Sequence, residues 1–200
     1  MSPHYRCDVE HWESMTDLIK TEVRETTGVI TLDRPKALNS LNHEMARAID
    51  ATLKQWRNDD AIAQVVVQSA GKHFCSGGDV RAAREGILDG RSTEVDAFFA
   101  DEYAMNLDIA NYPKPYIALC NGVIMGGGMG ISAHGSHMVV TEDAFASMPE
   151  MNIGYVTDVG MSWLLQNLPK RPSLPLGKFL ALTGYRLTPD DMLATGLATH

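Results

Sequence analysis

The sequence has few basic residues and no long apolar run. Its 17 lysines and arginines are outnumbered by 25 aspartates and glutamates, and Lys170 and Arg171 are the only adjacent basic pair. Because binding to nucleic acid releases counterions from a basic face, this deficit argues against a nucleic-acid partner. No apolar stretch has the length of a bilayer span, so we expect no membrane partner either.

Cysteines and histidines are too scattered to predict a disulfide framework or a metal site. The three cysteines, Cys7, Cys75 and Cys120, are odd in number and far apart, which is typical of a reducing compartment. His134 and His137 lie three residues apart, with no cysteine or further histidine nearby to complete a set of ligands. We therefore expect structural or solvent-facing histidines and no bound metal.

The beginning of the chain carries no clear targeting signal. Residues 1–16 are polar and irregular, and their acidic residues suit neither a secretory signal nor an Arg-rich transit peptide. This pattern predicts a soluble intracellular protein and keeps a cytoplasmic location open. Residues 17–200 are enough for one globular domain with a sizeable core.

The apolar pattern predicts alternating strands and helices, and hence an α/β layered fold. Thr26 to Gly28 separate two alternating stretches and predict a hairpin. Strands are predicted at 18–23, 29–32, 63–68 and 115–120. Helices are predicted from Asn42, from Asp79, over 94–111, 159–168 and 176–183, and from Thr188 to Gly196.

The chain is organised around a glycine run that follows the apolar strand at 115–120. Gly126, Gly127 and Gly128 open a predicted helix, although glycine costs about 1 kcal/mol per residue there. Without side chains, the amides at a helix start can approach an anion, or the oxyanion formed when a carbonyl is attacked. The alternative is that these glycines only let a helix pack closely on a sheet.

A second glycine loop and several acids complete the predicted site. Residues 71–79 join a β-branched strand to a helix, so two loops can present two N–H groups to one atom. Glu150 follows an apolar strand and Asp158 lies eight residues further on, which suggests chemistry at a carbonyl. Glu102 lies within a long predicted helix, where the pattern alone favours a solvated face. The run GGGMG lacks the full dinucleotide-binding fingerprint.

Three segments together resemble the crotonase, or enoyl-CoA hydratase/isomerase, superfamily: HFCSGGD (73–79), NGVIMGGGMG (121–130) and MPE (148–150). DEYAMN (101–106) and MPEMNIGYVTDVG (148–160) are most similar to its 3-hydroxyisobutyryl-CoA hydrolases. Over roughly residues 17–200, the resemblance implies a spiral of ββα units that binds an acyl-CoA thioester and needs no cofactor besides that CoA. It also implies valine breakdown in mitochondria, and further C-terminal helices that cover the acyl pocket and help to assemble homo-oligomers.

The resemblance implies a role for each part of the site. The N–H groups of Gly78 and Gly127 would form an oxyanion hole, Glu150 would be the catalytic carboxylate, and Asp158 would be a second acid near the acyl group. Glu102 would contact the substrate, contrary to the expectation from its pattern. The implied substrate-binding residues are Glu102, Gly127, Glu150 and Asp158, and the implied CoA-binding residues are Lys36, Ala37, Leu38, Gly77 and Asp79.

One position favours a hydrolase over a hydratase. Hydratases of the superfamily carry a second carboxylate just after the triple glycine, and that position is Gly130 here. Glu150 alone could attack the thioester to give an anhydride, or act as base for an attacking water. Both routes stay open, as do two alternative functions: an enoyl-CoA hydratase or isomerase, and an inactive acyl-CoA-binding module. Thr157 and Met161 replace residues common in the hydrolases, so the Asp158 loop is expected to be set differently.

Overall fold

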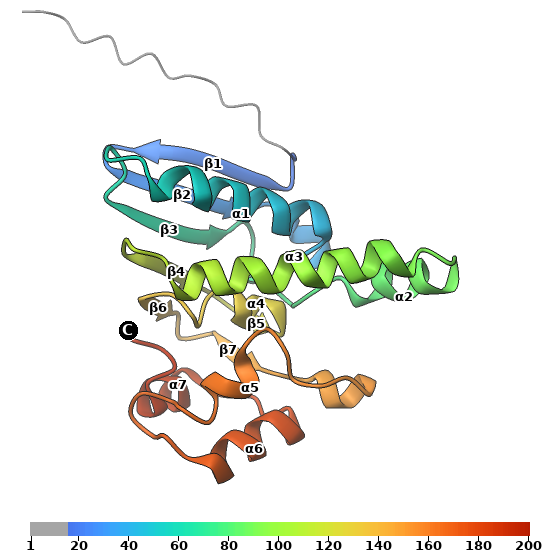
Figure 1. Ribbon diagram of the computed structural model, residues 1–200. Coiled ribbons are helices and arrows are strands. Elements are labelled where there is room, and N and C mark those ends of the chain that lie inside the picture. Colours follow the sequence, from blue (N-terminus) through green and yellow to red (C-terminus); the bar gives the residue numbers. More distant parts are fainter. Residues whose placement is uncertain (1–15) are drawn as a thin grey trace, which may run out of the picture.

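The computed structural model describes residues 16–200, and its largest sheet has five strands in the order β1-β2-β3-β4-β6 (Figure 1). The first two strands pair antiparallel as the predicted hairpin, and every other neighbouring pair is parallel. The strands are β1 (Ile19–Arg24), β2 (Thr27–Leu32), β3 (Gln64–Ser69), β4 (Tyr116–Cys120) and β6 (His137–Val140).

A second, smaller sheet positions the glycine loops. It consists of β5 (Val123–Met125) and β7 (Phe145–Ser147), which pair in parallel. Isolated bridges extend it, joining Leu41 to Gly78, Cys75 to Ile124 and Ala146 to Leu187. The chain therefore passes repeatedly from the large sheet to the small one and then into a helix. This arrangement confirms the predicted α/β class and the repeated ββα unit.

Helices begin where polar side chains cap them. The side chains of Asn42, Asp79 and Thr188 each accept a hydrogen bond from the amide three residues later. Helices were predicted to start at these three residues. The helical segments are η1 (Pro35–Ala37), α1 (His43–Arg57), α2 (Val80–Leu88), α3 (Ser92–Ala110), α4 (Gly127–Gly130), η2 (Glu150–Ile153), α5 (Met161–Leu164), α6 (Leu174–Thr183) and α7 (Pro189–Thr195).

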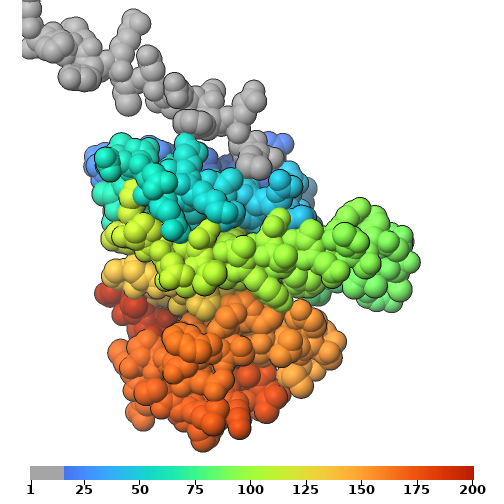
Figure 2. Space-filling model, in the orientation of Figure 1, coloured from blue at the N-terminus to red at the C-terminus, as the bar shows by residue number. Residues whose placement is uncertain are grey.

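The core lies between the large sheet and the helices α1 and α3, which cross it side by side (Figure 1). The apolar residues of α1 that recur at helical spacing, Met45, Ile49, Leu53 and Trp56, are all buried. Beyond the sheet, α2 and the first turns of α3 form a projection from the body of the molecule (Figure 2). From Phe98 onward α3 therefore rests on the core, whereas its first turns reach past it.

Several predicted boundaries were wrong. The helix predicted over 159–168 shrinks to α5, which starts after Gly160 in the left-handed region and is followed by turns. The helix predicted from residue 176 begins two residues earlier, because Pro175 fits the first turn of α6 and does not end it. A short 3-10 helix, η1, spans Pro35–Ala37, where no helix was predicted.

The remaining predictions on the ends and on single residues have mixed outcomes. The irregular segment predicted at 1–16 falls almost wholly outside the described residues, as does Cys7. Cys75 and Cys120 are free and buried. His134 Nε2 lies 2.7 Å from the carbonyl oxygen of Val159, in keeping with a structural role. Within residues 16–200, no helix combines the length and apolar character needed to span a membrane.

Candidate active site

Two glycines of the run face carboxyl groups. Gly126 has a φ of 47°, which L side chains rarely adopt, and a Cβ there would lie 3.0 Å from Glu150 Oε1. A Cβ on Gly127 would collide with Glu102 Oε1. Two acids from distant parts of the chain therefore reach the turn between β5 and α4, and only glycine leaves room for them.

The next glycines serve close packing. A Cβ on Gly128 would lie 2.5 Å from the carbonyl oxygen of Cys75. A Cβ on Gly130 would lie 2.9 Å from both Asn106 Oδ1 and Val159 Cβ. The two explanations for the glycine run thus apply to different residues: the first two admit functional groups, and the later ones admit neighbouring backbone and side chains.

The amides of Gly78 and Gly127 lie next to each other. The nitrogen of Gly78 is 3.2 Å from the position that a Cβ of Gly127 would take. Leu41 holds the loop on either side of Gly78. The N–H of Leu41 donates to the carbonyl oxygen of Gly77 (2.8 Å), and the N–H of Asp79 donates to the carbonyl oxygen of Leu41 (2.7 Å). Across residues 16–200 the N–H of Gly78 donates to no backbone carbonyl, and that of Gly127 precedes the first intrahelical bond of α4.

The helix after the glycine run is shorter than predicted. α4 has four residues, so its macrodipole is small and the expected contribution of a helix N-terminus is largely lost. What remains is the geometry of individual N–H groups on two separate loops. Any stabilisation of negative charge at this point must come from these donors directly.

Glu150 is nearly buried at the end of the small sheet. It follows Pro149 at the start of η2 and is 8% exposed. Within residues 16–200 its Oε2 atom has no hydrogen-bond partner. Burial raises the pKa of the Glu150 carboxyl to about 7, and the charge of Asp158 adds to the rise. Such a group changes protonation near neutral pH, as a general base must.

Glu102 is more deeply buried than Glu150, so the solvated face expected from its helical pattern is wrong. The residue is 2% exposed, and within the described part of the chain Oε1 has no hydrogen-bond partner. Burial, followed by the charge of Asp158, raises its pKa to about 8. Oε1 also lies 4.0 Å from the Cβ position of Gly78, so Glu102 borders both amide-bearing loops.

Two tyrosines tie the Asp158 loop to α3. Tyr103 Oη donates to Asp158 Oδ2 at 2.7 Å and lies 3.2 Å from Tyr155 Oη. The Tyr155 ring stacks on Phe99, with centroids 5.9 Å apart. Burial raises the pKa of Asp158, and the hydrogen bond from Tyr103 opposes that rise. Thr157 holds the other side of this loop through a bond from Oγ1 to the carbonyl oxygen of Ala181.

Sequence reasoning missed Asn106 and the two tyrosines as site residues. Asn106 is one helical turn after Glu102 on α3, is 4% exposed, and within residues 16–200 neither its Oδ1 nor its Nδ2 has a hydrogen-bond partner. The spacing of four between two polar residues could have indicated this face of α3. Nothing in the sequence indicates that Tyr155 reaches Tyr103 across more than fifty residues.

The residues expected to bind CoA line one edge of the site. Lys36 and Ala37 lie in η1, and Leu38 follows with a φ of 51° and receives a hydrogen bond from Ser76 N–H at 3.0 Å. Gly77 and Asp79 are next to that segment, but the Asp79 carboxylate already binds Arg34 at 2.8 Å and caps α2. Asp79 is therefore committed to structure, which leaves its backbone for ligand contacts.

Asn39 holds this edge together. It is 1% exposed and accepts from the N–H of Arg34 at 2.8 Å. Its side-chain amide donates to the carbonyl oxygens of Ala70 at 2.9 Å and His73 at 2.8 Å. The segment around η1 is therefore bonded to the loop that leads to Gly78.

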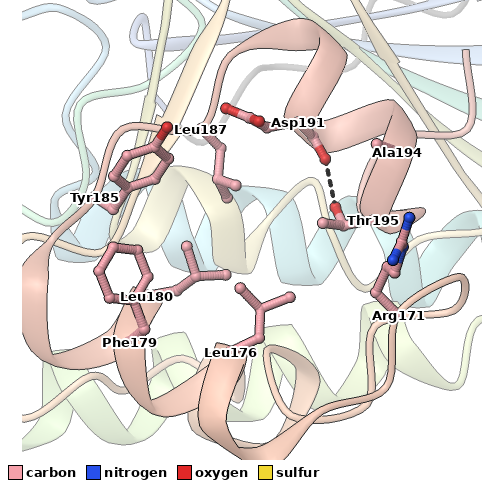
Figure 3. A pocket seen from close by; sticks show the side chains of 9 residues that line it. All are labelled: Arg171, Leu176, Phe179, Leu180, Tyr185, Leu187, Asp191, Ala194 and Thr195. Atoms are coloured by element: carbon pink, nitrogen blue, oxygen red, sulfur yellow. Dashed lines mark hydrogen bonds between the residues drawn. The ribbon is translucent and has the colours of Figure 1, made fainter.

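Two hollows differ in their relation to these carboxyl groups. One, of about 290 Å³, lies between α6 and α7 and contains none of the predicted site residues (Figure 3). Asp191, at its rim, belongs to the capping box of α7, and its carbonyl oxygen accepts from Thr195 Oγ1. The other, of about 310 Å³, is lined by none of these carboxyl groups, but its lining includes Tyr103, which donates to Asp158, as well as Asn106 and Val159.

Within residues 16–200, no three His, Cys, Asp or Glu side chains gather closely enough to hold an ion. The site instead combines two backbone donors, two buried carboxyl groups with raised pKa values and a third acid held by Tyr103. This combination suits the attack of a weak nucleophile on a polarised carbonyl.

The chain is similar to curated proteins of one activity over most of its length. It is 47% identical over 174 residues to the mitochondrial 3-hydroxyisobutyryl-CoA hydrolase of Danio rerio, covering 86% of this chain and 44% of that protein. It is 43% identical over 180 residues to the human protein of the same name, covering 90% of this chain and 45% of that one. The chain thus spans about half the length of the curated relatives it matches.

Solved structures and a family model agree with this similarity. A carnitinyl-CoA dehydratase from Mycobacterium thermoresistibile superposes with a TM-score of 0.85 at 40% identity, over 92% of this chain and 53% of that one. An enoyl-CoA hydratase from Rhodobacter sphaeroides gives 0.85 at 39% identity, over 91% and 53%. The enoyl-CoA hydratase/isomerase model matches residues 27–200. With its glycine loops and ββα repeats, the chain belongs to the enoyl-CoA hydratase/isomerase family, the crotonase superfamily.

Proposed function

We propose that this chain carries the catalytic site of an acyl-CoA thioester hydrolase that acts on a short β-hydroxyacyl group such as 3-hydroxyisobutyryl. One observation carries the proposal: the Gly78 nitrogen lies 3.2 Å from the Cβ position of Gly127, and Glu150 Oε1 lies 3.0 Å from the Cβ position of the neighbouring Gly126. The curated relatives named 3-hydroxyisobutyryl-CoA hydrolase support the substrate class. Because the chain spans about half of them, the activity of the whole protein is part of this proposal.

In the proposed reaction the thioester oxygen accepts hydrogen bonds from both glycine amides. Glu150, ionised in part near pH 7, takes a proton from water while the hydroxyl oxygen adds to the carbonyl carbon. The tetrahedral intermediate collapses, the C–S bond breaks, and the CoA thiolate takes up the proton. The products are the free acid and CoA. Donors fixed at the oxyanion are worth about a hundredfold to a thousandfold each in rate.

Glu150 can also act as the nucleophile. In this route its carboxylate oxygen adds to the thioester carbon, CoA leaves as thiol after protonation, and water opens the resulting anhydride. A single turnover in ¹⁸O-labelled water separates the two routes by mass spectrometry. Label in the peptide that contains Glu150 requires an anhydride opened at the enzyme carbonyl, whereas label in the product acid alone agrees with activated water.

The contacts of Asp158 support a role beside the acyl group. Tyr103 holds its carboxylate at 2.7 Å, and Tyr103 also lines a hollow together with Asn106. We propose that Asp158 orients the substrate hydroxyl or the attacking water. Lys36, Ala37, Leu38, Gly77 and the backbone of Asp79 are proposed to contact the CoA portion.

A hydratase is the second candidate. Gly130 leaves no room for the carboxylate that hydratases carry there, because Asn106 and Val159 occupy the space, and this supports hydrolysis. Glu102, however, supplies a second buried carboxyl group on the other side of the glycine run. Loss of the enoyl absorbance of crotonyl-CoA on incubation with the protein would favour hydration.

The deciding experiment measures free CoA released from 3-hydroxyisobutyryl-CoA. We expect release by the wild-type protein, loss in Glu150→Gln, and unchanged release in Glu142→Gln, a surface control on the same segment. Wild-type rates from Glu150→Gln would remove that residue from the mechanism. Tight CoA binding by calorimetry without any turnover would identify an inactive binding module.

The location and assembly of the protein are also proposals. The curated relatives are named mitochondrial, and we extend this location, and a role in valine breakdown, to the present protein. Fractionation of cells that express the tagged protein tests the location against a cytoplasmic one. Light scattering of the purified protein tests the predicted homo-oligomer.

A further inference from the structure

Glu102 occupies an unusual place for an acid, because it lies where negative charge would develop. Its Oε1 atom lies against Gly127, at the point where a Cβ would collide with it, and 4.0 Å from the Cβ position of Gly78. These two residues carry the amides proposed to hold the thioester oxygen. Within residues 16–200 this oxygen atom has no hydrogen-bond partner and the residue is 2% exposed. The carboxyl group is thus a buried, unpartnered polar group beside both glycines that carry these amides.

The charges around Glu102 do not favour its ionised form. The charge of Asp158, from the loop, acts on Glu102, and Cys75 contributes a buried thiol. Glu150, at the end of the small sheet, lies against Gly126, next to the glycine that Glu102 touches. Tyr103, next on α3, directs its hydroxyl to Asp158, and His43 of α1 pairs with Asp101 on the neighbouring position. Across residues 16–200 no Lys, Arg or His forms an ion pair with Glu102.

An ionised Glu102 would oppose the reaction. Two negative charges about 4 Å apart near a protein surface repel each other enough to slow a reaction roughly a thousandfold. A protonated carboxyl group at the same place has the opposite effect, because its O–H can donate to the developing oxyanion. Proteins do use a carboxylic acid kept neutral in an apolar site as such a donor.

We propose that Glu102 is held protonated and donates a third hydrogen bond to the thioester oxygen, beside the amides of Gly78 and Gly127. This role goes beyond contact with the substrate and rests on the proposed hydrolysis. It excludes Glu102 as a second base, which a hydratase mechanism would require. It also gives the glycine at position 127 a specific purpose, since any side chain there would displace the donor.

The test compares a substitution that keeps a hydrogen-bond donor with one that removes it. Glu102→Gln keeps the shape and an N–H donor, so we expect kcat within about fivefold of the wild type at pH 7. Glu102→Ala removes the donor, and we expect a loss of about a hundredfold in kcat. KM should change less than kcat, because the bond strengthens in the transition state. Asp96→Asn, an exposed position on the same helix, is the control for both.

The pH profile gives a readout that a purely structural role would not change. Wild-type activity should fall as the pH rises through about 8, where Glu102 ionises, and this alkaline decrease should disappear in Glu102→Gln. If Glu102→Gln is as slow as Glu102→Ala, the residue acts through its charge and the proposal is wrong. An alkaline decrease that persists in Glu102→Gln also overturns it.

Infrared spectroscopy separates this inference from the proposed function. The band of protonated carboxyl groups at pH 7 should be equally strong in the wild type and in Asp96→Asn, and weaker in Glu102→Gln, where the contribution of Glu102 is lost and only that of Glu150 remains. If the protein releases no CoA from any thioester but the band behaves in this way, the hydrolase proposal fails and the protonated state stands. If no band depends on Glu102, the inference fails whatever the enzymatic activity.

Discussion

Two buried asparagines show how the edge of the molecule and its site differ. Asn39 uses both its oxygen and its nitrogen, in three hydrogen bonds that join η1 to the loop before Gly78. Asn106 is also buried, yet within residues 16–200 neither of its side-chain atoms has a partner, and the same is true of Glu102 Oε1 and Glu150 Oε2. Natural proteins pair most buried polar groups, so a cluster of unpaired ones marks a place for a ligand.

The contrast teaches that burial alone does not distinguish structure from function here. Around Asn39 the buried polar groups form hydrogen bonds that hold loops in position. Between α3, the glycine run and the loop at 150–158, several buried polar groups have no hydrogen-bond partner and can bind a ligand. The first region makes the second possible, because Asn39 and Leu41 fix the loop that carries the Gly78 amide. The following predictions test this division, beginning with the largest expected effect.

Glu150→Gln should reduce CoA release by about a hundredfold to ten-thousandfold, because it removes the group that accepts the proton of water. Stability at pH 8 should stay equal or increase, since a neutral amide is easier to bury than a carboxylate. Steady-state kinetics and urea unfolding of the same preparations measure both. A large loss of stability together with the loss of activity would instead assign Glu150 to the structure.

Gly127→Ala should lower kcat by about a hundredfold or more, because the new Cβ collides with Glu102 Oε1 and lies 3.2 Å from the Gly78 nitrogen. Gly78→Ala is the matched variant, since its Cβ would have no neighbour closer than 3.7 Å. We expect the smaller loss there. Equal losses of kcat in the two variants would contradict the idea that Gly127 is needed to leave room for the Glu102 side chain.

Asn39→Ala should destabilise the protein by about 2 to 4 kcal/mol, because three backbone groups lose their partner and alanine is strained at the positive φ of this residue. Asn106→Ala should cost less than about 1 kcal/mol, since no hydrogen bond is broken within the described residues. Denaturant unfolding compares the two directly. Equal costs would end the distinction between these two buried amides.

Stability should also depend on pH through the site and not through the Asn39 region. Glu102 and Glu150 have pKa values of about 8 and about 7 in the folded protein, above the ordinary value of 4.5. The folded state therefore holds more protons, and the unfolding free energy should fall by up to about 6 kcal/mol between pH 5 and pH 8. Glu102→Gln should flatten this slope, whereas Asn39→Ala should shift the whole curve in parallel.

Tyr103→Phe should have the smallest effect, a change of a few-fold in kcat/KM. The substitution removes the hydrogen bond to Asp158, and with it an influence that lowers the pKa of this acid. The acid limb of the activity profile should therefore move to higher pH. A shift to lower pH would show that Tyr103 acts on another group.

The sequence by itself determined the fold class, because its determinants are local. Period-two and helical spacing, the capping residues Asn42, Asp79 and Thr188, and the hairpin around Thr27 depend on neighbours within a few positions. The same holds for the two glycine loops, whose motifs indicated the family that the comparisons then showed. The helix after Asp158 was predicted too long, because the left-handed Gly160 delays the start of α5 and the chain turns after Leu164.

Only the tertiary structure decided what the acids do. The helical pattern predicted a solvated face for Glu102. In the structure α3 packs against the glycine run, which buries Glu102 and raises its pKa. Tyr103 and Tyr155 acquire meaning in the same way, across more than fifty residues of chain. Protonation and hydrogen bonding depend on every group within a few ångströms, and such neighbours come from segments whose order in the sequence carries no record of their contact.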